Sequence, residues 1–239
     1  MVSIRILQAI GPSYAQDYVT RFGFDPKQHP AYLTLALGAG STTPLQMAGA
    51  YAVFANGGYR IKPYFISKIT DDKGGILFTA SPESAVEVES NQSGMKQAER
   101  VIDPRNAFIM SSLMRDVVRY GTAARAMSLG RNDLAGKTGT TNDHFDAWFA
   151  GFSPGLVAIS WIGFDNPSDL GNNETGGQAA LPIWMSYMAK ALKGVKEMPF
   201  EPPAGIAAVP LAGELTKDGK PALEFIYAES QGNLNDGPA

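Results

Sequence analysis

The chain has 239 residues, of which 44% are apolar and 18% charged, proportions typical of a packed globular protein rather than a disordered one. The formal net charge of −3 is small and of the wrong sign for a nucleic-acid-binding protein, so no nucleic-acid partner is expected. Cysteine is absent, which excludes disulfides and thiolate metal sites. His29 and His144 are too far apart in sequence to predict a zinc site, so neither a metal nor a cofactor is predicted.

The first residues predict neither a membrane span nor a signal peptide. No apolar run reaches the roughly 18 residues that cross a bilayer. Met1–Ile10 mixes polar residues into its apolar pattern and lacks a small-residue cleavage site. Its spacing predicts an amphipathic helix ending at Gly11–Pro12. Because no capping residue precedes this helix, we expect the sequence to begin inside a domain.

Residues 1–60 are predicted to be mainly helical. A second amphipathic helix spans Ser13–Phe22, with Gly23 at the position after the helix that glycine favours. A third helix begins at Ser41–Pro44, where hydroxyl side chains precede a proline, and ends at Asn56–Gly58.

The middle of the chain changes character. Two strands, over 64–69 and 75–78, are predicted to form a hairpin around Asp71–Gly74. Residues 81–99 are polar and predict an exposed loop. Asp103–Pro104 then starts a helix that extends to about Tyr120, followed by a short helix over 123–127.

Residues 134–164 predict three strands, over 134–141, 145–152 and 156–164. Their short connections imply antiparallel neighbours. Because the second and third strands are almost continuously apolar, helices should cover both faces of the sheet, one of them over 178–192. The chain is therefore predicted to have an α+β fold, with an antiparallel sheet between helices and a helical subdomain.

Gly136-Lys137-Thr138 allows two interpretations. A phosphate-binding loop needs a first glycine five residues before the second, and that position is Arg131. Such a loop also follows a strand and opens a helix, whereas the strand signals here come after the triplet. The nucleotide-binding interpretation is therefore the weaker one.

The stronger interpretation is a Lys-Thr-Gly substrate strand of the kind found beside a nucleophilic serine. The Lys137 ammonium would give positive potential for an anionic peptide terminus. The Thr138 hydroxyl could donate to a carboxylate, and Gly139 would let substrate lie against the strand backbone. Taken alone, however, the triplet would favour a simpler interpretation, in which Lys137 is a solvated charge on an edge strand and Gly139 is a bulge.

The surrounding segments decide between these interpretations. They are Leu37–Gly38, Thr43–Pro44, Tyr51–Ala52, Asn56–Gly58, Gly121–Ala123, Leu134–Asn142, Asp146–Phe152, Trp161–Gly163, Glu174–Gly177 and Pro182–Trp184. In order and spacing these segments resemble the bifunctional (class A) penicillin-binding proteins, and the resemblance covers roughly residues 1–192.

The resemblance implies a β-lactamase/transpeptidase-like fold and a D,D-transpeptidase that cross-links peptidoglycan stem peptides and is acylated by β-lactams. It implies that Lys137 is the catalytic lysine of a cleft and that Thr138, Gly139, Thr140 and Thr141 bind substrate. The Thr140 amide is a candidate oxyanion donor. The implied partners are the D-Ala-D-Ala end of a stem peptide and β-lactams. The implied location is the periplasmic side of the bacterial inner membrane.

The resemblance also divides the chain. Residues 1–194 are expected to be the C-terminal portion of the transpeptidase domain. Residues 195–239 are expected to be a loosely attached tail with a small hairpin.

The sequence departs from this family in its nucleophile. The family's Ser-x-x-Lys motif occurs once, at Ser93–Lys96, inside the polar loop and about forty residues before Lys137. No Ser-x-Asn triplet occurs. We expect the serine, the N-terminal half of the domain and a membrane anchor to lie outside this chain, which would then be inactive alone and would expose apolar faces. The alternatives are a non-catalytic peptide-binding remnant and, less favoured, a serine β-lactamase.

Overall fold

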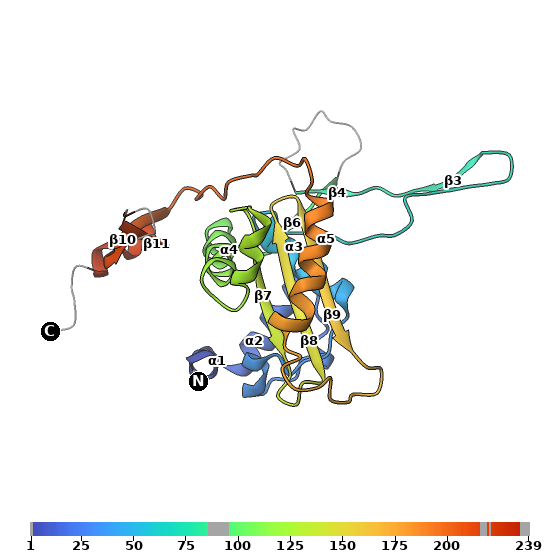
Figure 1. The fold of residues 1–239 in the computed structure, drawn as a ribbon. Helices are drawn as coiled ribbons and strands as arrows, with labels where there is room; N and C mark the ends of the chain where they lie inside the picture. Colours follow the sequence, from blue (N-terminus) through green and yellow to red (C-terminus); the bar gives the residue numbers. More distant parts are fainter. Residues whose placement is uncertain (1, 86–95, 216–218, 220, 235–239) are drawn as a thin grey trace.

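The computed structural model describes residues 2–85, 96–215, 219 and 221–234, and Figure 1 shows their arrangement. A three-stranded antiparallel sheet forms the centre. It consists of β7 (Ala135–Thr140), β8 (Asp146–Ser153) and β9 (Leu156–Gly163), in chain order. The three predicted strands are confirmed to within one residue at every end. Lys137 lies opposite Ala150, which fixes the register between β7 and β8.

Helices cover both faces of this sheet, as predicted. One face packs against α5 (Leu181–Ala191), whose Trp184 meets Phe149 at a ring-centroid distance of 4.9 Å. The other face packs against α3 (Pro44–Ala55) and α4 (Pro104–Arg119). The mixed helix-and-strand fold is therefore confirmed.

Local signals explain where the long helices begin. The side chains of Thr43 and Gln46 form a reciprocal capping box at the start of α3. Asp103 caps α4 by accepting the amide of Arg105 at 2.8 Å. The last predicted helix differs at its start, because a π-helical turn, η5 (Gly176–Ala180), precedes α5.

The N-terminal region is less helical than predicted. It contains α1 (Val2–Ile10) and α2 (Pro12–Val19), but between Gly23 and α3 it forms only short 3₁₀ turns. The 3₁₀ segments of the chain are η1 (Thr20–Phe22), η2 (Pro26–Gln28), η3 (Leu33–Leu37), η4 (Ala124–Leu129) and η6 (Ala228–Leu234).

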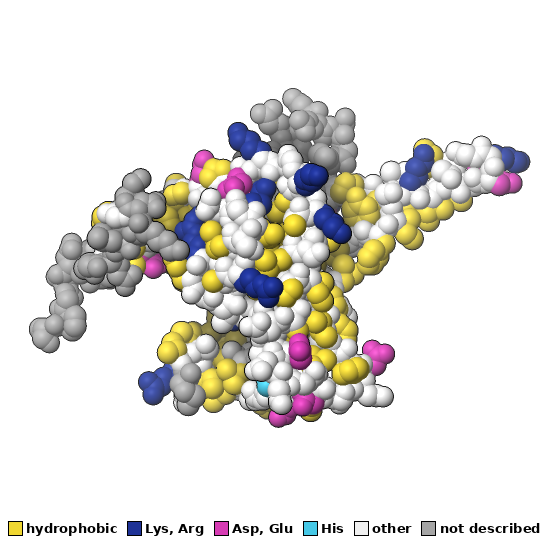
Figure 2. Space-filling view, in the orientation of Figure 1, with side chains coloured by type: hydrophobic (Ala, Val, Ile, Leu, Met, Phe, Trp, Pro, Cys, Tyr) yellow, Lys and Arg dark blue, Asp and Glu magenta, His cyan; other side chains and the backbone are white. Residues whose placement is uncertain are grey.

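A two-stranded arm of β2 (Lys68–Thr70) and β3 (Ile76–Thr79) projects from the body (Figure 1), which confirms the predicted hairpin in shorter form. Hydrophobic side chains lie along it (Figure 2), and Phe65 near its base is 85% exposed. The predicted loop over 81–99 falls partly on residues outside the described ranges. Its described parts form short strands: β4 (Glu83–Ser84) pairs with β5 (Lys96–Gln97), and β6 (Glu99–Arg100) pairs with β1 (Tyr59–Arg60) from earlier in the chain.

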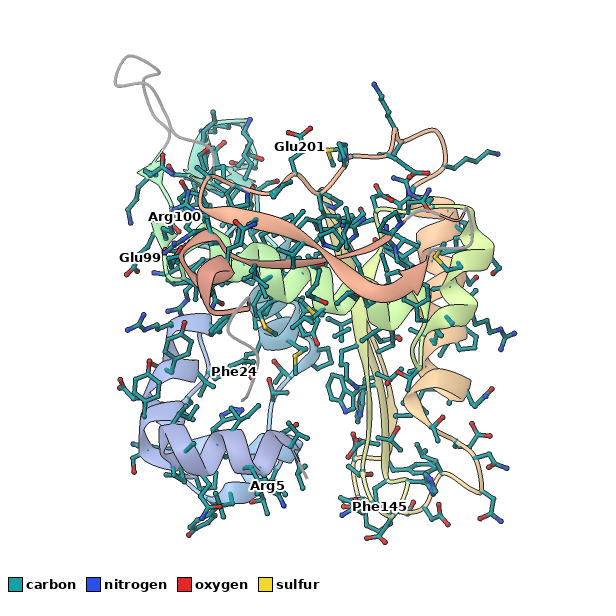
Figure 3. All side chains as sticks on the ribbon, turned by 90° about the vertical axis from the view of Figure 1, so that its left-hand side faces the viewer. Arg5, Phe24, Glu99, Arg100, Phe145 and Glu201 are labelled. Atoms are coloured by element: carbon teal, nitrogen blue, oxygen red, sulfur yellow. The ribbon has the colours of Figure 1, made fainter. Side chains whose placement is uncertain are left out.

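The C-terminal residues form a hairpin of β10 (Ile206–Leu215) and β11 (Pro221–Tyr227). It lies across α4 (Figure 3), where the rings of Phe108 and Phe225 meet edge to face at 5.0 Å. Arg105 of α4 also pairs with Glu229 at 2.9 Å. Across the described ranges, no helix is both long and apolar enough to span a bilayer.

Candidate functional site

The Lys-Thr-Gly triplet lies in the middle of β7, which is the outer strand of the described sheet. An outer strand presents backbone N–H and C=O groups along its unpaired edge. Gly136, Lys137 and Thr138 are strand residues rather than a loop opening a helix, so the geometry rules out the phosphate-loop interpretation.

Alternation along β7 divides the predicted site residues between two faces. Ala135 packs with Met114 of α4 and Phe152, so Lys137 and Gly139 share the face that α3 and α4 cover elsewhere. Thr138 and Thr140 belong to the opposite face, on the side of α5. The two threonine hydroxyls are therefore neighbours on one face of the unpaired edge.

Each of these hydroxyls is held by a different segment. The Thr138 hydroxyl lies 2.7 Å from that of Thr122, in the loop after α4. The Thr140 hydroxyl accepts the amide of Gly176 at 3.0 Å. Because the amide is the only donor in the second contact, Thr140 keeps its own proton for a ligand.

The turn containing Gly176 packs directly against the strand. A Cβ at Gly176 would lie 2.5 Å from the Gly139 carbonyl oxygen, and a Cβ at Gly177 would lie 3.0 Å from the Thr122 carbonyl oxygen. The Thr175 side chain accepts the amide of Gln178 at the start of η5. The segment 174–177 therefore caps η5 and also contacts β7.

Lys137, the predicted catalytic lysine, lies on the opposite face of β7 from the two threonines. Its side chain is exposed, and its ammonium donates to the carbonyl of Thr138 at 3.0 Å. The sheet extends beyond α4 toward Phe145 (Figure 3). A cavity of about 550 Å³ lies elsewhere, between Tyr18 and the start of α4. Within the described ranges, Lys137 therefore lies at an open strand edge rather than in an enclosed cleft.

Thr141 lies just beyond the end of β7 and organises the turn into β8. Its hydroxyl accepts the amides of Phe145 at 2.8 Å and Asp146 at 3.0 Å. His144 occupies this turn with a φ of 52°, and its carbonyl accepts the amide of Leu170. Thr141 thus has a structural role that the sequence prediction did not include.

The tryptophans divide into two groups. Trp184 is buried on the α5 face, as a core residue should be. Trp148 and Trp161 lie on the same face as Lys137, with ring centroids 5.7 Å apart. Trp161 is 37% exposed and donates to Asp146 at 2.7 Å, so it is not a core residue.

The alternative nucleophile motif is only partly described. Lys96 forms an exposed ion pair with Glu83 at 3.1 Å, while Ser93 falls outside the described residues. In the part of the chain that the structure describes, no three His, Asp or Glu side chains converge on a metal position.

Sequence reasoning missed Thr122 and Gly176 as neighbours of the strand. They lie 16 and 36 residues from their partners, a separation that local patterns do not resolve. Both do fall inside segments that carry the family resemblance, Gly121–Ala123 and Glu174–Gly177, and this was the available signal.

A profile described as the penicillin-binding protein transpeptidase domain matches residues 1–184. The chain belongs to this family. Penicillin-binding protein 1A of Neisseria flavescens is 51% identical over 206 residues, which are 86% of this chain and 25% of that protein. Penicillin-binding protein 1A of Pseudomonas aeruginosa is 40% identical over 264 residues, covering 94% of this chain and 32% of that protein.

A solved structure supports the same assignment. The crystal structure of penicillin-binding protein 1A from Haemophilus influenzae superposes with a TM-score of 0.84 at 35% identity, covering 95% of this chain and 38% of that one. The chain therefore has the transpeptidase fold of this family. It spans about a quarter to a third of the length of the curated relatives described above.

Proposed function

We propose that this chain supplies the substrate-binding strand of a peptidoglycan D,D-transpeptidase. The observation that carries the proposal is the pair of threonine hydroxyls, Thr138 and Thr140, on one face of an unpaired strand edge. A hydroxyl pair on a strand that also carries a lysine suits the terminal carboxylate of a stem peptide ending in D-Ala-D-Ala, or the carboxylate of a β-lactam.

Each predicted site residue has a role in this proposal. Lys137 supplies the positive potential of the site, and Thr138 and Thr140 donate to the carboxylate. Gly139 has no side chain, so the substrate backbone approaches the strand there. The Thr140 amide is the proposed oxyanion donor. Thr141 has one hydroxyl proton left to donate beyond its two accepted bonds.

The reaction we propose is acyl transfer through a serine outside this sequence. The serine oxygen attacks the carbonyl of the D-Ala-D-Ala bond, and the terminal D-Ala leaves with a proton on its amine. An amine from a neighbouring stem peptide then attacks the ester and returns the serine proton. The chain has no Ser-x-Asn triplet and is a fraction of its relatives' length, so we expect it to be inactive alone.

The remaining expectations belong to the same proposal. Residues 1–194 form the C-terminal portion of the transpeptidase domain, completed by an upstream portion, and residues 195–239 form a C-terminal extension. The exposed face with Lys137 and Trp161 is compatible with an upstream portion that packs there. The complete protein would act on the periplasmic side of the inner membrane, held by an N-terminal anchor.

A fluorescent penicillin tests the proposal. We expect a covalent band with the full-length protein and none with the 239-residue chain alone. In the full-length protein, Thr138→Val with Thr140→Val should slow labelling roughly 10-fold or more, because two donors to the carboxylate are lost. Labelling of the isolated chain that disappears with Ser93→Ala would overturn the proposal.

Two other functions give different results in the same experiment. A peptide-binding remnant would bind stem peptide without labelling, even at full length. A serine β-lactamase would turn over a chromogenic β-lactam many times per protein molecule, because its acyl-enzyme is hydrolysed rather than retained.

A further inference from the structure

A short hydrogen bond joins the loop after α4 to the Lys-Thr-Gly strand. It links the hydroxyls of Thr122 and Thr138, whose oxygens are 2.7 Å apart. The proposed function gives Thr138 a role at the substrate carboxylate but gives none to Thr122. Both side chains are accessible from solvent, so the pair lies where a ligand on the strand edge can reach it.

The backbone holds Thr122 in place from both sides. The amides of Gly121 and Ala123 both donate to the Val117 carbonyl, each at 3.1 Å. Ala123 is fully buried, and a Cβ at Gly121 would lie 2.9 Å from Val117 Cα. The Thr122 carbonyl also packs against Gly177 of the turn before α5. Thr122 is thus fixed before any ligand binds.

The single proton of each threonine hydroxyl limits what this contact can do. A threonine hydroxyl has one proton to donate and lone pairs that accept. If Thr138 donated to Thr122, it could not donate to a carboxylate. If Thr122 donates to Thr138, the Thr138 proton is free for the ligand. The Thr140 hydroxyl already accepts in this way, because its partner is the Gly176 amide, which can only donate. The Thr140 proton is therefore free for the ligand.

We propose that Thr122 is a positioning residue that donates to Thr138 and so directs the Thr138 proton toward the ligand carboxylate. This inference rests on the proposed function. With Gly176 acting on Thr140, the strand then presents two outward donors to one anionic group. The site should therefore favour a ligand with a free carboxylate over the corresponding neutral ester, and Thr122 should contribute to that preference.

The test compares acylation of the full-length protein by benzylpenicillin and by its methyl ester. We expect Thr122→Val to lower the rate constant for the acid roughly 2- to 10-fold, as loss of one hydrogen bond predicts, and to leave that for the ester unchanged. Thr122→Ser keeps the hydroxyl and should restore most of the acid rate. Combined with Thr138→Val, Thr122→Val should add nothing, because it acts through Thr138.

The ratio of acid to ester rates is measured on one sample, so partial unfolding of a variant does not change it. Ser128→Ala, which removes an exposed hydroxyl from the following turn, is the matched control and should leave the ratio unchanged. If Thr122→Val lowered the acylation rate equally for acid and ester, or if its effect added to that of Thr138→Val, the role of Thr122 would be overturned but the proposed function would not. A wild-type protein that neither probe acylates would overturn the proposed function, and this inference with it.

Discussion

Gly176 lies directly over Gly139, and a single added carbon on Gly176 would stand 2.5 Å from the Gly139 carbonyl oxygen. The same carbon would meet the carbonyl oxygen of Trp148 as well. This contact between two residues without side chains places the turn before α5 against the substrate strand. It also brings the Gly176 amide within 3.0 Å of the Thr140 hydroxyl.

We therefore predict that Gly176→Ala displaces this turn. Rigid backbone oxygens face the new methyl group, so relief requires movement of the turn and loss of the bond to Thr140. The stability cost should be about 1–3 kcal/mol, as for other overpacked sites. Penicillin acylation of the full-length protein should slow by more than Thr140→Val alone slows it. Denaturation monitored by tryptophan fluorescence gives the first quantity, and labelling kinetics give the second.

Gly155→Ala is the matched control for this substitution. A Cβ there would approach only the terminal methyl of Met198, at 3.1 Å. Because the Met198 side chain is flexible, it can move aside. We expect little change in stability or labelling. If both alanine variants behaved like the wild type, Gly176 would not be required for close packing.

Gly136, another glycine of β7, packs against the core rather than against the proposed substrate. A Cβ at Gly136 would lie 2.7 Å from the Phe149 ring and 2.7 Å from the Ala150 carbonyl oxygen. Gly136→Ala should therefore push Phe149 against Trp184 and destabilise the protein by about 1–3 kcal/mol. At Gly139 the nearest atom to a Cβ is the Trp148 Cβ, at 3.2 Å. In thermal denaturation, Gly139→Ala should therefore destabilise the protein less than Gly136→Ala does. A larger loss of stability from Gly139→Ala would contradict this packing.

These contacts show which parts of the fold could be predicted from the sequence alone and which could not. The three central strands and α4 were predictable, because alternation, short turns and the Asp103 cap are local signals. The π-helical start of α5 was not, because Gly176 owes its conformation to contact with Gly139.

The site divides in the same way. The Lys-Thr-Gly strand was predictable from its motif and from the resemblance of the surrounding segments, whereas the contacts of Thr122 and Gly176 depend on folding over 16 and 36 residues. The exposure of Lys137 was only one of the possibilities that the sequence left open. Sequence patterns place a residue on a face but do not say what covers that face.

Asp133, two residues before the start of β7, anchors the segment after α5. It is 2% exposed, pairs with Arg131 at 2.6 Å and accepts the Met198 amide at 3.2 Å. Asp133→Ala leaves the Arg131 charge and that amide without their partner. Loss of one member of a buried pair costs about 3–5 kcal/mol, and we expect the lower end because Arg131 retains some access to water.

The comparison variant is Glu83→Ala, which removes the ion pair with Lys96. The Lys96 side chain is 74% exposed, so this loss should cost under about 1 kcal/mol. Urea denaturation of both variants measures the difference. Similar losses from the two would mean that burial does not strengthen the Asp133 pair.

Stability should also fall at alkaline pH because of Tyr51. This residue of α3 packs edge-on against Phe152, and burial raises the pKa of its hydroxyl from 10.0 to about 12. Below pH 10 both the folded and unfolded states keep the proton. Between pH 10 and 12 the unfolded state loses it while the folded state does not, so stability falls as pH rises. The loss should approach about 1.4 kcal/mol for each unit of pKa difference.

Lysines titrate in the same range, so the slope must be assigned by substitution. Denaturant midpoints between pH 9 and 11.5 should fall less steeply in Tyr51→Phe, which has no proton to lose. Tyr120→Phe removes a hydroxyl from a residue that is 70% exposed, and its slope should match that of the wild type. Because the unfolded state is the one that ionises, the Tyr51→Phe difference should appear above pH 10 and be absent at pH 9. An identical slope in all three proteins would show that the Tyr51 hydroxyl reaches water in the folded state.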